Sequence, residues 1–258
     1  AGNGSAWKLT VGGLKGGHSG ERIGDGRGNA IQILAQILFS MGQEGIPVAA
    51  ASLEGGTARN AIPATAAAIF VSNVEEEKIR QGSMLLEKED FPELSFDHQA
   101  VELVSSQGKF LGCGYISKQN KGLGWLVSKQ KVDFDRDFFI SLFEKAKEKR
   151  RFYRLAEDIT AYRLFNQEGD GFAGLTVDQY GDYALLSWYN PFVISLKEEI
   201  LQAFQEVFPE LMGAYEKIRF KGLDYESAHV YGAEAPEVFK VLENGVAYQV
   251  FLNDGLMT

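Results

Sequence analysis

Apolar and polar positions near the start of the chain follow the patterns of a small α/β layer. Residues 7–11 alternate with the period of two that is typical of a strand. Residues 29–41 follow helical spacing, with apolar side chains at Ile31, Leu34, Ala35, Leu38 and Phe39. Two further strands are predicted at 48–53 and 64–71. These elements together predict an α/β layer within residues 1–71.

From residue 75 onward the pattern changes to longer alternations of strands and amphipathic helices. The first predicted elements are a charged helix at 75–86 and the strands of a small β module at 100–104, 110–116 and 124–127. An amphipathic helix at 135–155 is expected to turn inward Phe138, Phe139, Leu142, Phe143 and Ala146. The remaining predicted elements are strands at 158–165, 175–179 and 183–188, a helix at 196–208, and strands at 217–220, 237–243 and 246–252. The predicted fold class is therefore multidomain, with α/β and α+β parts and no internal repeat.

Composition changes abruptly between the two patterns. The chain has a formal net charge of −9, but residues 1–71 carry five basic and four acidic residues, or +1, which leaves −10 for the remainder. The first part also holds 14 of the 29 glycines and only 3 of the 31 aromatic residues. Such a step indicates two units with separate strand sets and cores, joined near residues 71–78.

Bulk properties point to a cytoplasmic protein. Cys113 is the one cysteine, which excludes a disulfide framework and fits a reducing compartment. No apolar run approaches the roughly 20 residues that a membrane span needs, and no signal peptide is visible at the start. We therefore expect neither a membrane nor a DNA partner.

One histidine stands among five glycines, in the stretch GGLKGGHSG. His18 has no second ligand at the spacing of a zinc site, and Ser19 is adjacent to it rather than placed as a triad nucleophile. The Gly-Lys-Ser/Thr signature of a phosphate loop is also missing. Chemistry alone favours a histidine in a polar turn.

Two motifs change this interpretation, GGHSG and the later GGTARNAIP. Residues 6–71 resemble the lid, or dimerisation, domain of the aminoacyl-histidine dipeptidases, which belong to a superfamily of zinc exopeptidases. The resemblance implies that His18 stabilises a tetrahedral oxyanion beside zinc, and that Arg59 and Asn60 bind a peptide carboxylate. It also implies a homodimer formed through residues 1–71. The match weakens after the proline, where the family has Arg-Glu and this chain has Ala64-Thr65.

The rest of the chain carries a different signature, spread over four segments. They read KIRQGSMLLEKEDFPEL, GKFLGCGYISKQNKGLGWLVS, AYRLFNQEGDGFAGLTVDQYGDY and ENGVAYQVFLNDGLMT. Residues 72–258 resemble the N-terminal two-thirds of the S-adenosylmethionine-dependent methyltransferases that make 5-methylcytosine in large-subunit ribosomal RNA. The resemblance implies a PUA-like RNA-binding module at 72–130 and a central α/β domain at 131–243. Residues 244–258 would begin a Rossmann-like methyltransferase domain that we expect to be truncated.

Neither implied catalytic centre is complete in this sequence. Methylation at carbon 5 of cytosine needs a cysteine nucleophile, and Cys113 lies in a predicted hairpin where a small buried hydrophobe is expected. The zinc-binding domain that would use His18 is also not recognisable. We therefore expect this chain to bind neither S-adenosylmethionine nor zinc. We interpret it as a composite: a chimeric, mis-assembled or engineered reading frame.

Structured RNA is the expected partner. The segment 118–154 holds eleven basic and five acidic residues, a local +6 that suits phosphates. The candidate contacts lie mainly on loops: Lys118, Lys121, Lys129 and Lys131. The alternative is a solvated helix face with ion pairs at i,i+4 spacing. Two alternatives from other classes stay open, a dipeptidase lid and an interaction module without activity.

Two further segments, one acidic and both containing glycine, are candidate sites or turns. Gly169-Asp170-Gly171 with Asp178 and Asp182 suggests a calcium loop, but the spacing fails the EF-hand template and favours hairpin turns. Asn244-Gly245 suits a turn with positive φ between two strands.

Overall fold

The computed structural model of the chain contains two compact units, Ala1–Lys131 and Val132–Thr258. The structure describes residues 8–11, 17–18, 37, 54–55, 61–62, 66–70, 73–87, 98–105, 109–119 and 122–253. The predicted strand at 48–53 and, apart from Ile37, the predicted helix at 29–41 lie outside the described residues.

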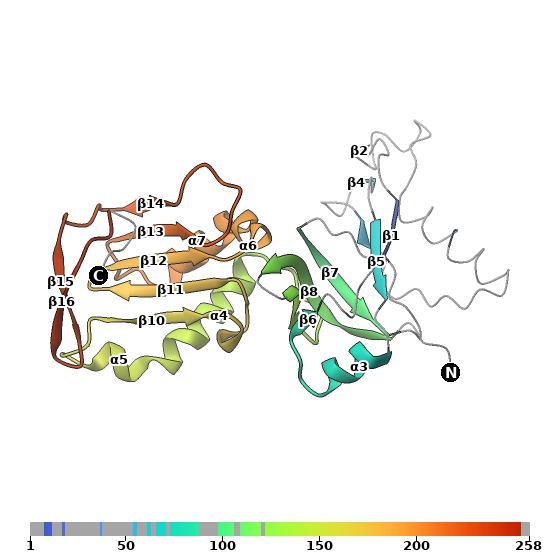
Figure 1. Cartoon of the computed structure of the whole chain (residues 1–258), viewed down its shortest axis with the longest axis horizontal. Helices are drawn as coiled ribbons and strands as arrows, with labels where there is room; N and C mark the ends of the chain where they lie inside the picture. Colours follow the sequence, from blue (N-terminus) through green and yellow to red (C-terminus); the bar gives the residue numbers. More distant parts are fainter. Residues whose placement is uncertain are drawn as a thin grey trace. The chain divides into compact units, whose positions relative to one another are not determined.

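The first unit is built around a seven-stranded sheet in the order β1-β5-β7-β8-β9-β6, with β3 paired to β5 (Figure 1). Its strands are β1 Lys8–Val11, β3 Glu54–Gly55, β5 Ala66–Phe70, β6 Leu85–Glu87, β7 Gln99–Val104, β8 Phe110–Gln119 and β9 Gly122–Ser128. A separate pair joins β2 Gly17–His18 to β4 Ala61–Ile62. The strands predicted at 7–11, 64–71, 100–104, 110–116 and 124–127 are confirmed.

Strand β5 lies parallel to β7, with Ile69 opposite Leu103 and Phe70 opposite Val104. We expected separate strand sets on the two sides of the composition step, and this pairing shows that expectation to be wrong for β5. The reason is that a change in residue usage does not restrict backbone hydrogen bonding, since every strand edge carries the same donors and acceptors.

Strands β7, β8 and β9 form an antiparallel meander over a small apolar core. The core residues of this unit are Ile79, Leu86, Val101, Leu103, Leu111, Ile116 and Leu126. Gly114 allows β8 and β9 to approach closely, because a Cβ atom there would lie 2.1 Å from the carbonyl oxygen of Trp125. The glycine-rich β8 is therefore a packing requirement of the sheet.

Helix α3, Asn73–Arg80, is shorter than the predicted helix at 75–86. Gly82 adopts a φ of +101°, its N–H donates to Ile79, and the N–H of Ser83 donates to Lys78. This is the Schellman arrangement that ends helices at a left-handed residue. The prediction was wrong for Leu85 and Leu86, which belong to β6 and pair with β9.

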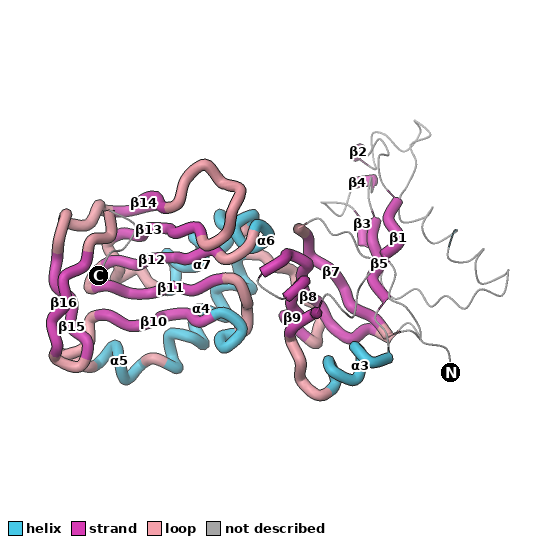
Figure 2. Tube along the Cα trace, viewed as in Figure 1, coloured by secondary structure: helices cyan, strands magenta, loops and turns pink. Residues whose placement is uncertain are grey.

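The second unit contains a five-stranded sheet in the order β10-β11-β12-β13-β14, in which β12 and β13 are parallel and the other neighbours antiparallel. Its strands are β10 Ala161–Asn166, β11 Leu175–Tyr180, β12 Tyr183–Trp188, β13 Gly213–Ile218 and β14 Ser227–Gly232. A hairpin of β15 Phe239–Glu243 and β16 Val246–Val250 lies across one end of this sheet, as Figure 2 shows. Asn244 and Gly245 both have positive φ in its turn, as predicted.

Helices α4, Arg136–Lys149, and α7, Lys197–Val207, pack together on the sheet. Phe143 of α4 joins the layers, because its ring centroid lies 5.3 Å from that of Phe165 in β10 and 5.5 Å from that of Phe204 in α7. Asp135 caps α4 by accepting from the N–H of Phe138 at 2.9 Å. The predicted inward face is confirmed at Phe139, Leu142, Phe143 and Ala146, whereas Phe138 is half-buried.

Two predictions in this unit need correction, and two elements were missed. The helix expected at 135–155 is interrupted at Arg150, after which α5 covers Arg151–Leu155. The strand expected at 217–220 begins earlier, at Gly213. Strand β14 and the short helix α6, Pro191–Ser195, were not predicted. Half-buried β14 lacks a clean alternation of polar and apolar residues, so its sequence carries little strand signal.

A mixed α/β class is confirmed by these sheets and helices. Among the helices of the described residues, none is both long enough and apolar enough to cross a lipid bilayer.

Candidate nucleic-acid interface

Two of the lysines predicted to contact RNA, Lys118 and Lys129, lie at opposite ends of the β8–β9 hairpin. Lys118 is exposed near the tip, where Gln119 pairs with Gly122. Lys121 lies outside the described residues. Lys129 is exposed just beyond the other end of β9, where Ser128 pairs with Cys113. The two ends are separated by six residues of strand, or about 20 Å at 3.3 Å per residue. The lysines therefore form two basic points and not one patch.

The ammonium group of Lys131 is already paired with side chains of the first unit. Its Nζ lies 3.0 Å and 3.1 Å from the two carboxylate oxygens of Glu102, and 5.4 Å from the ring centroid of Phe110. Within the described part of the chain, Lys118 and Lys129 form no ion pair. They are therefore better placed than Lys131 to exchange water for phosphate.

The lid residues are described only in part. His18 lies in β2, with its backbone opposite Ala61 of β4. Arg59 and Asn60 lie outside the described residues. The structure therefore places one of the three residues implied by the lid resemblance, and only by its backbone.

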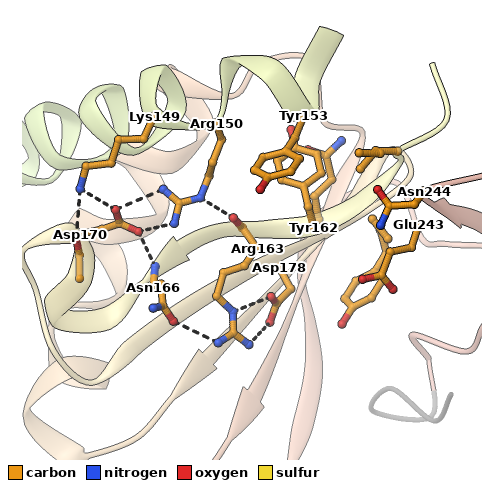
Figure 3. A pocket seen from close by; sticks show the side chains of 15 residues that line it. Lys149, Arg150, Tyr153, Tyr162, Arg163, Asn166, Asp170, Asp178, Glu243 and Asn244 are labelled. Atoms are coloured by element: carbon orange, nitrogen blue, oxygen red, sulfur yellow. Dashed lines mark hydrogen bonds and ion pairs between the residues drawn. The ribbon is translucent and has the colours of Figure 1, made fainter. Parts of the chain in front are cut away.

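A groove of about 870 Å³ opens in the second unit, and the sequence did not predict it (Figure 3). The end of α4 and helix α5 form one wall, strands β10 and β11 form the floor, and the β15–β16 turn lies at the far end. Its charged lining residues are Lys149, Arg150, Arg163, Asp170, Asp178 and Glu243. The sequence signal that could have indicated it is the basic and aromatic run KRRFYRL at 149–155.

Asp170 is the centre of a buried ion cluster at one end of the groove. Its carboxylate accepts from Arg150 at 2.6 Å and 3.2 Å, from Lys149 at 3.0 Å, and from the backbone N–H of Asn166 at 2.7 Å. Burial alone would raise the pKa of Asp170, but these hydrogen bonds outweigh it and lower the pKa below its ordinary value. The carboxylate is therefore occupied, and it ties α4 to the 3₁₀ helix η3, Gln167–Asp170.

The hairpin interpretation of Gly169–Gly171 holds for its position, because the segment connects the antiparallel strands β10 and β11, but the connection is longer than a tight turn. The segment is the end of η3, and Gly171 closes it with a φ of +99°. By contrast, Gly181 and Asp182 form a tight hairpin turn between β11 and β12. The cations of α4 compete for Asp170, which also argues against a calcium loop there.

Arg163 and Asp178 form a second pair on the groove floor. They lie on neighbouring strands and meet side by side, with Arg163 Nε and Nη2 donating to the carboxylate at 2.8 Å and 3.2 Å. The hydrogen bond to Asp178 raises the pKa of Arg163. Arg163 also donates to the Asn166 side chain at 3.1 Å, so its guanidinium is fixed in one orientation.

Three tyrosines give the groove an aromatic side. The rings of Tyr153 and Tyr162 stack, with centroids 5.7 Å apart and planes 28° apart. Burial raises the pKa of Tyr162. Burial, together with the charge of Asp178, raises the pKa of Tyr180 to about 12. The phenols of Tyr162 and Tyr180 are therefore neutral near pH 7, and the three rings offer flat apolar surfaces with a hydrogen-bonding edge.

Most cations of the basic run 136–154 are paired within the second unit. The pairs are Arg136–Glu206, Lys147–Glu210, Arg151–Glu148 and Arg154–Glu210, besides the cluster at Asp170. The alternative of an ion-paired helix face is thus partly right, but Arg151–Glu148 is spaced i,i+3 and the other partners come from distant elements. Among the described residues, Lys145 has no ion pair. The segment 136–154 therefore offers fewer unpaired cations to RNA phosphates than its net charge indicated.

The described residues do not fit either implied cofactor. Strand β12 enters α6 through Asn190 and Pro191, without glycine, and Asn190 already accepts from the N–H of Val193 at 3.0 Å. A nucleotide-type cradle needs free N–H groups at such a turn. Cys113 is buried in β8, so it is unsuited to attack a base. No group of three or more His, Cys, Asp or Glu among the residues the structure describes could hold a metal ion. We assign no catalytic step to these residues.

Two family models match the first half of the chain. A model of the PUA-like domain matches residues 69–129, and a model of the peptidase dimerisation domain matches residues 6–82. The two matches overlap at residues 69–82, which include α3. The lid resemblance is supported by this family model only.

Relatives of known sequence and structure carry methyltransferase names. The chain is 38% identical over 190 residues to YwbD of Bacillus subtilis, a candidate ribosomal RNA large subunit methyltransferase, covering 70% of this chain and 48% of that protein. It is 30% identical over 167 residues to ribosomal RNA large subunit methyltransferase I of Aliivibrio fischeri, covering 62% and 42%.

A solved structure from Streptococcus mutans, named as a candidate S-adenosylmethionine-dependent methyltransferase, is 52% identical. It superposes with a TM-score of 0.69 over 73% of this chain and 49% of that one. A second solved chain with the same identity and TM-score is a candidate methyltransferase complexed with SAH. The chain thus spans about half the length of the relatives it matches, and those relatives carry the names of methyltransferases, several of them of large-subunit ribosomal RNA.

Proposed function

We propose that this chain is the RNA-binding and substrate-orienting portion of a ribosomal RNA (cytosine-5) methyltransferase that uses S-adenosylmethionine. The observation that carries the proposal is the PUA-like match at 69–129, in a chain whose relatives are named for large-subunit ribosomal RNA. The substrate implies a cytoplasmic location. We assign methyl transfer to the part of these relatives that does not align with this chain.

RNA binding would depend on the exposed lysines at the two ends of β9. Lys118 and Lys129 each offer a solvated ammonium that can displace a counterion from a phosphate. Each contact contributes about −0.9 to the slope of log K against log salt for a duplex, and about −0.7 for a single strand. Lys121, three residues further along the sequence, is proposed as an additional contact. Two to four such contacts predict weak binding that falls steeply with salt.

The test is an anisotropy titration of large-subunit ribosomal RNA fragments with the full chain at several salt concentrations. Lys118→Glu and Lys129→Glu are each expected to flatten the slope by about one unit. Lys145→Glu is the matched control, because it makes the same charge change at an exposed site on α4 and should leave the slope unchanged. Binding that does not depend on salt, or equal slopes for all variants, would refute the proposal.

A second candidate follows from the match of residues 6–82 to the peptidase dimerisation domain. We propose that this segment derives from an aminoacyl-histidine dipeptidase lid, fused to the methyltransferase portion, with His18, Arg59 and Asn60 in the roles that the resemblance implies. Such a lid would form a homodimer and complete a zinc site held elsewhere. Sedimentation velocity of the full chain over a concentration series tests this, since a concentration-independent monomer would contradict it.

A further inference from the structure

Helix α5 exposes more apolar surface than any neighbouring element of the groove. Phe152 is 72% exposed and Leu155 is 80% exposed, and Tyr153 is about half exposed. Large apolar side chains that lie together on a surface mark an interaction site more often than isolated ones do. Helix α5 is therefore a candidate contact surface.

The charges around these side chains restrict what binds there. Residues 149–155, KRRFYRL, carry four cations and no acid. Among the described residues, Arg151 forms an ion pair with the exposed Glu148 and lies 5.0 Å from the ring centroid of Phe152, and Arg154 lies 3.7 Å from Glu210. Exposed pairs of this kind contribute little and exchange easily. Both guanidinium groups are thus available to an anionic partner.

The groove beside α5 is balanced in charge. Its lining holds three cations, Lys149, Arg150 and Arg163, and three carboxylates, so it does not attract a polyanion by its field alone. What it offers instead is the stacked pair Tyr153 and Tyr162, which leads from the exposed α5 to the groove floor (Figure 3). Flat neutral rings beside fixed hydrogen-bonding groups suit an uncharged, planar ring.

We propose that α5 and the groove bind an unpaired segment of RNA, with one base stacked on Tyr153 at the groove, a neighbouring base in contact with the exposed Phe152, and the flanking phosphates held by Arg151 and Arg154. This inference rests on the proposed function, and it adds a second RNA-contacting surface to the one formed by Lys118 and Lys129. Proteins that bind unpaired bases without sequence preference stack the bases on aromatic side chains and hold the phosphates with nearby arginines. A protein partner would use the same apolar side chains but would not need the two exchangeable arginines, Arg151 and Arg154.

The test compares a fluorescent, unstructured RNA decamer with an RNA duplex of equal charge in anisotropy titrations of the full chain. Phe152→Ala with Tyr153→Ala should weaken binding of the decamer by about tenfold or more, the loss of one stacked base. The salt slope should stay the same, because no phosphate contact is lost, and duplex binding should change little. Tyr153→Trp should retain affinity. Tyr248→Ala, an equally exposed tyrosine outside the groove, is the control and should bind as the wild type.

The outcomes separate this inference from the proposed function. If the wild-type chain binds neither RNA, the proposed function fails. If it binds RNA and the double alanine variant binds the decamer equally well, only the stacking site is refuted. A double variant that changes sedimentation but not RNA affinity would show that α5 contacts protein, and this also overturns the inference.

Discussion

Replacement of Asp170 by asparagine should unfold the second unit at a markedly lower temperature. The side chain of Asp170 is 3% exposed and that of Arg150 is 14% exposed, so the substitution leaves a buried guanidinium without its counterion. Breaking a buried pair in this way costs about 3–5 kcal/mol. Arg150 keeps its bonds to the carbonyl oxygens of Ala146 and Arg163, and Lys149 is largely solvated. We therefore expect the low end, about 3 kcal/mol, or roughly a 10 °C fall in Tm.

The effect has a defined dependence on pH. The pKa of Asp170 is lowered in the folded chain, so the carboxylate contributes its full stabilisation above the ordinary pKa of about 3.9. That stabilisation is lost as the pH falls through the lower, folded pKa, because the carboxyl group must then be protonated. The difference between wild type and Asp170→Asn should accordingly be constant between pH 5 and 7, values chosen well above about 3.9, and should shrink at more acidic pH.

Urea denaturation at several pH values measures this difference directly. Asp178→Asn is the control, since the Arg163 side chain of that pair is 45% exposed and the loss should stay near or below about 1 kcal/mol. The reasoning is refuted if Asp170→Asn is as stable as the wild type at pH 7, or if the two variants lose equal stability.

Further substitutions probe other structural features. Burial raises the pKa of Tyr180 to about 12, so in an alkaline absorbance titration Tyr180→Phe should lose one phenol that ionises near that pH. Loss of a phenol that ionises at an ordinary pKa would contradict the burial argument. Gly114→Ala should destabilise the first unit by about 1–3 kcal/mol in thermal melts, because its Cβ would meet the Trp125 carbonyl; an unchanged Tm would show that β8 and β9 can separate without cost. Gly245→Ala should cost about 1–2 kcal/mol because φ is positive there, whereas Asn244→Gly should be nearly neutral.

Local patterns predicted much of the sheet and helix content. The predicted bounds of strand β12 match the observed ones at both ends. The turn at Asn244-Gly245 was predicted from the preference of these residues for positive φ. Both features depend on neighbouring residues alone. The groove was not predictable in this way. The partners of Asp170 lie about twenty residues away on α4, and spacing in the sequence does not reveal such a pair.

The break at Arg150 has the same kind of cause. Helical periodicity continues through Arg151–Leu155, so the sequence gives no stop signal, yet Arg150 leaves the helical region with a φ of −102° and a ψ of 12°. Its guanidinium is drawn to Asp170 and to the Arg163 carbonyl, both on other elements. Tertiary hydrogen bonds thus decide where α4 ends, and with it which aromatic side chains of α5 become exposed.

Crosslinking by ultraviolet light, followed by mass spectrometry, tests most directly whether this chain contacts ribosomal RNA through the surfaces described. The full chain is irradiated with large-subunit ribosomal RNA fragments at low salt, and crosslinked peptides are identified. We predict crosslinks in peptides that contain Lys118, Lys129 or residues 151–155, each lost at high salt or on substitution. Efficient crosslinking confined to other segments, or none above the unirradiated sample, would contradict the account.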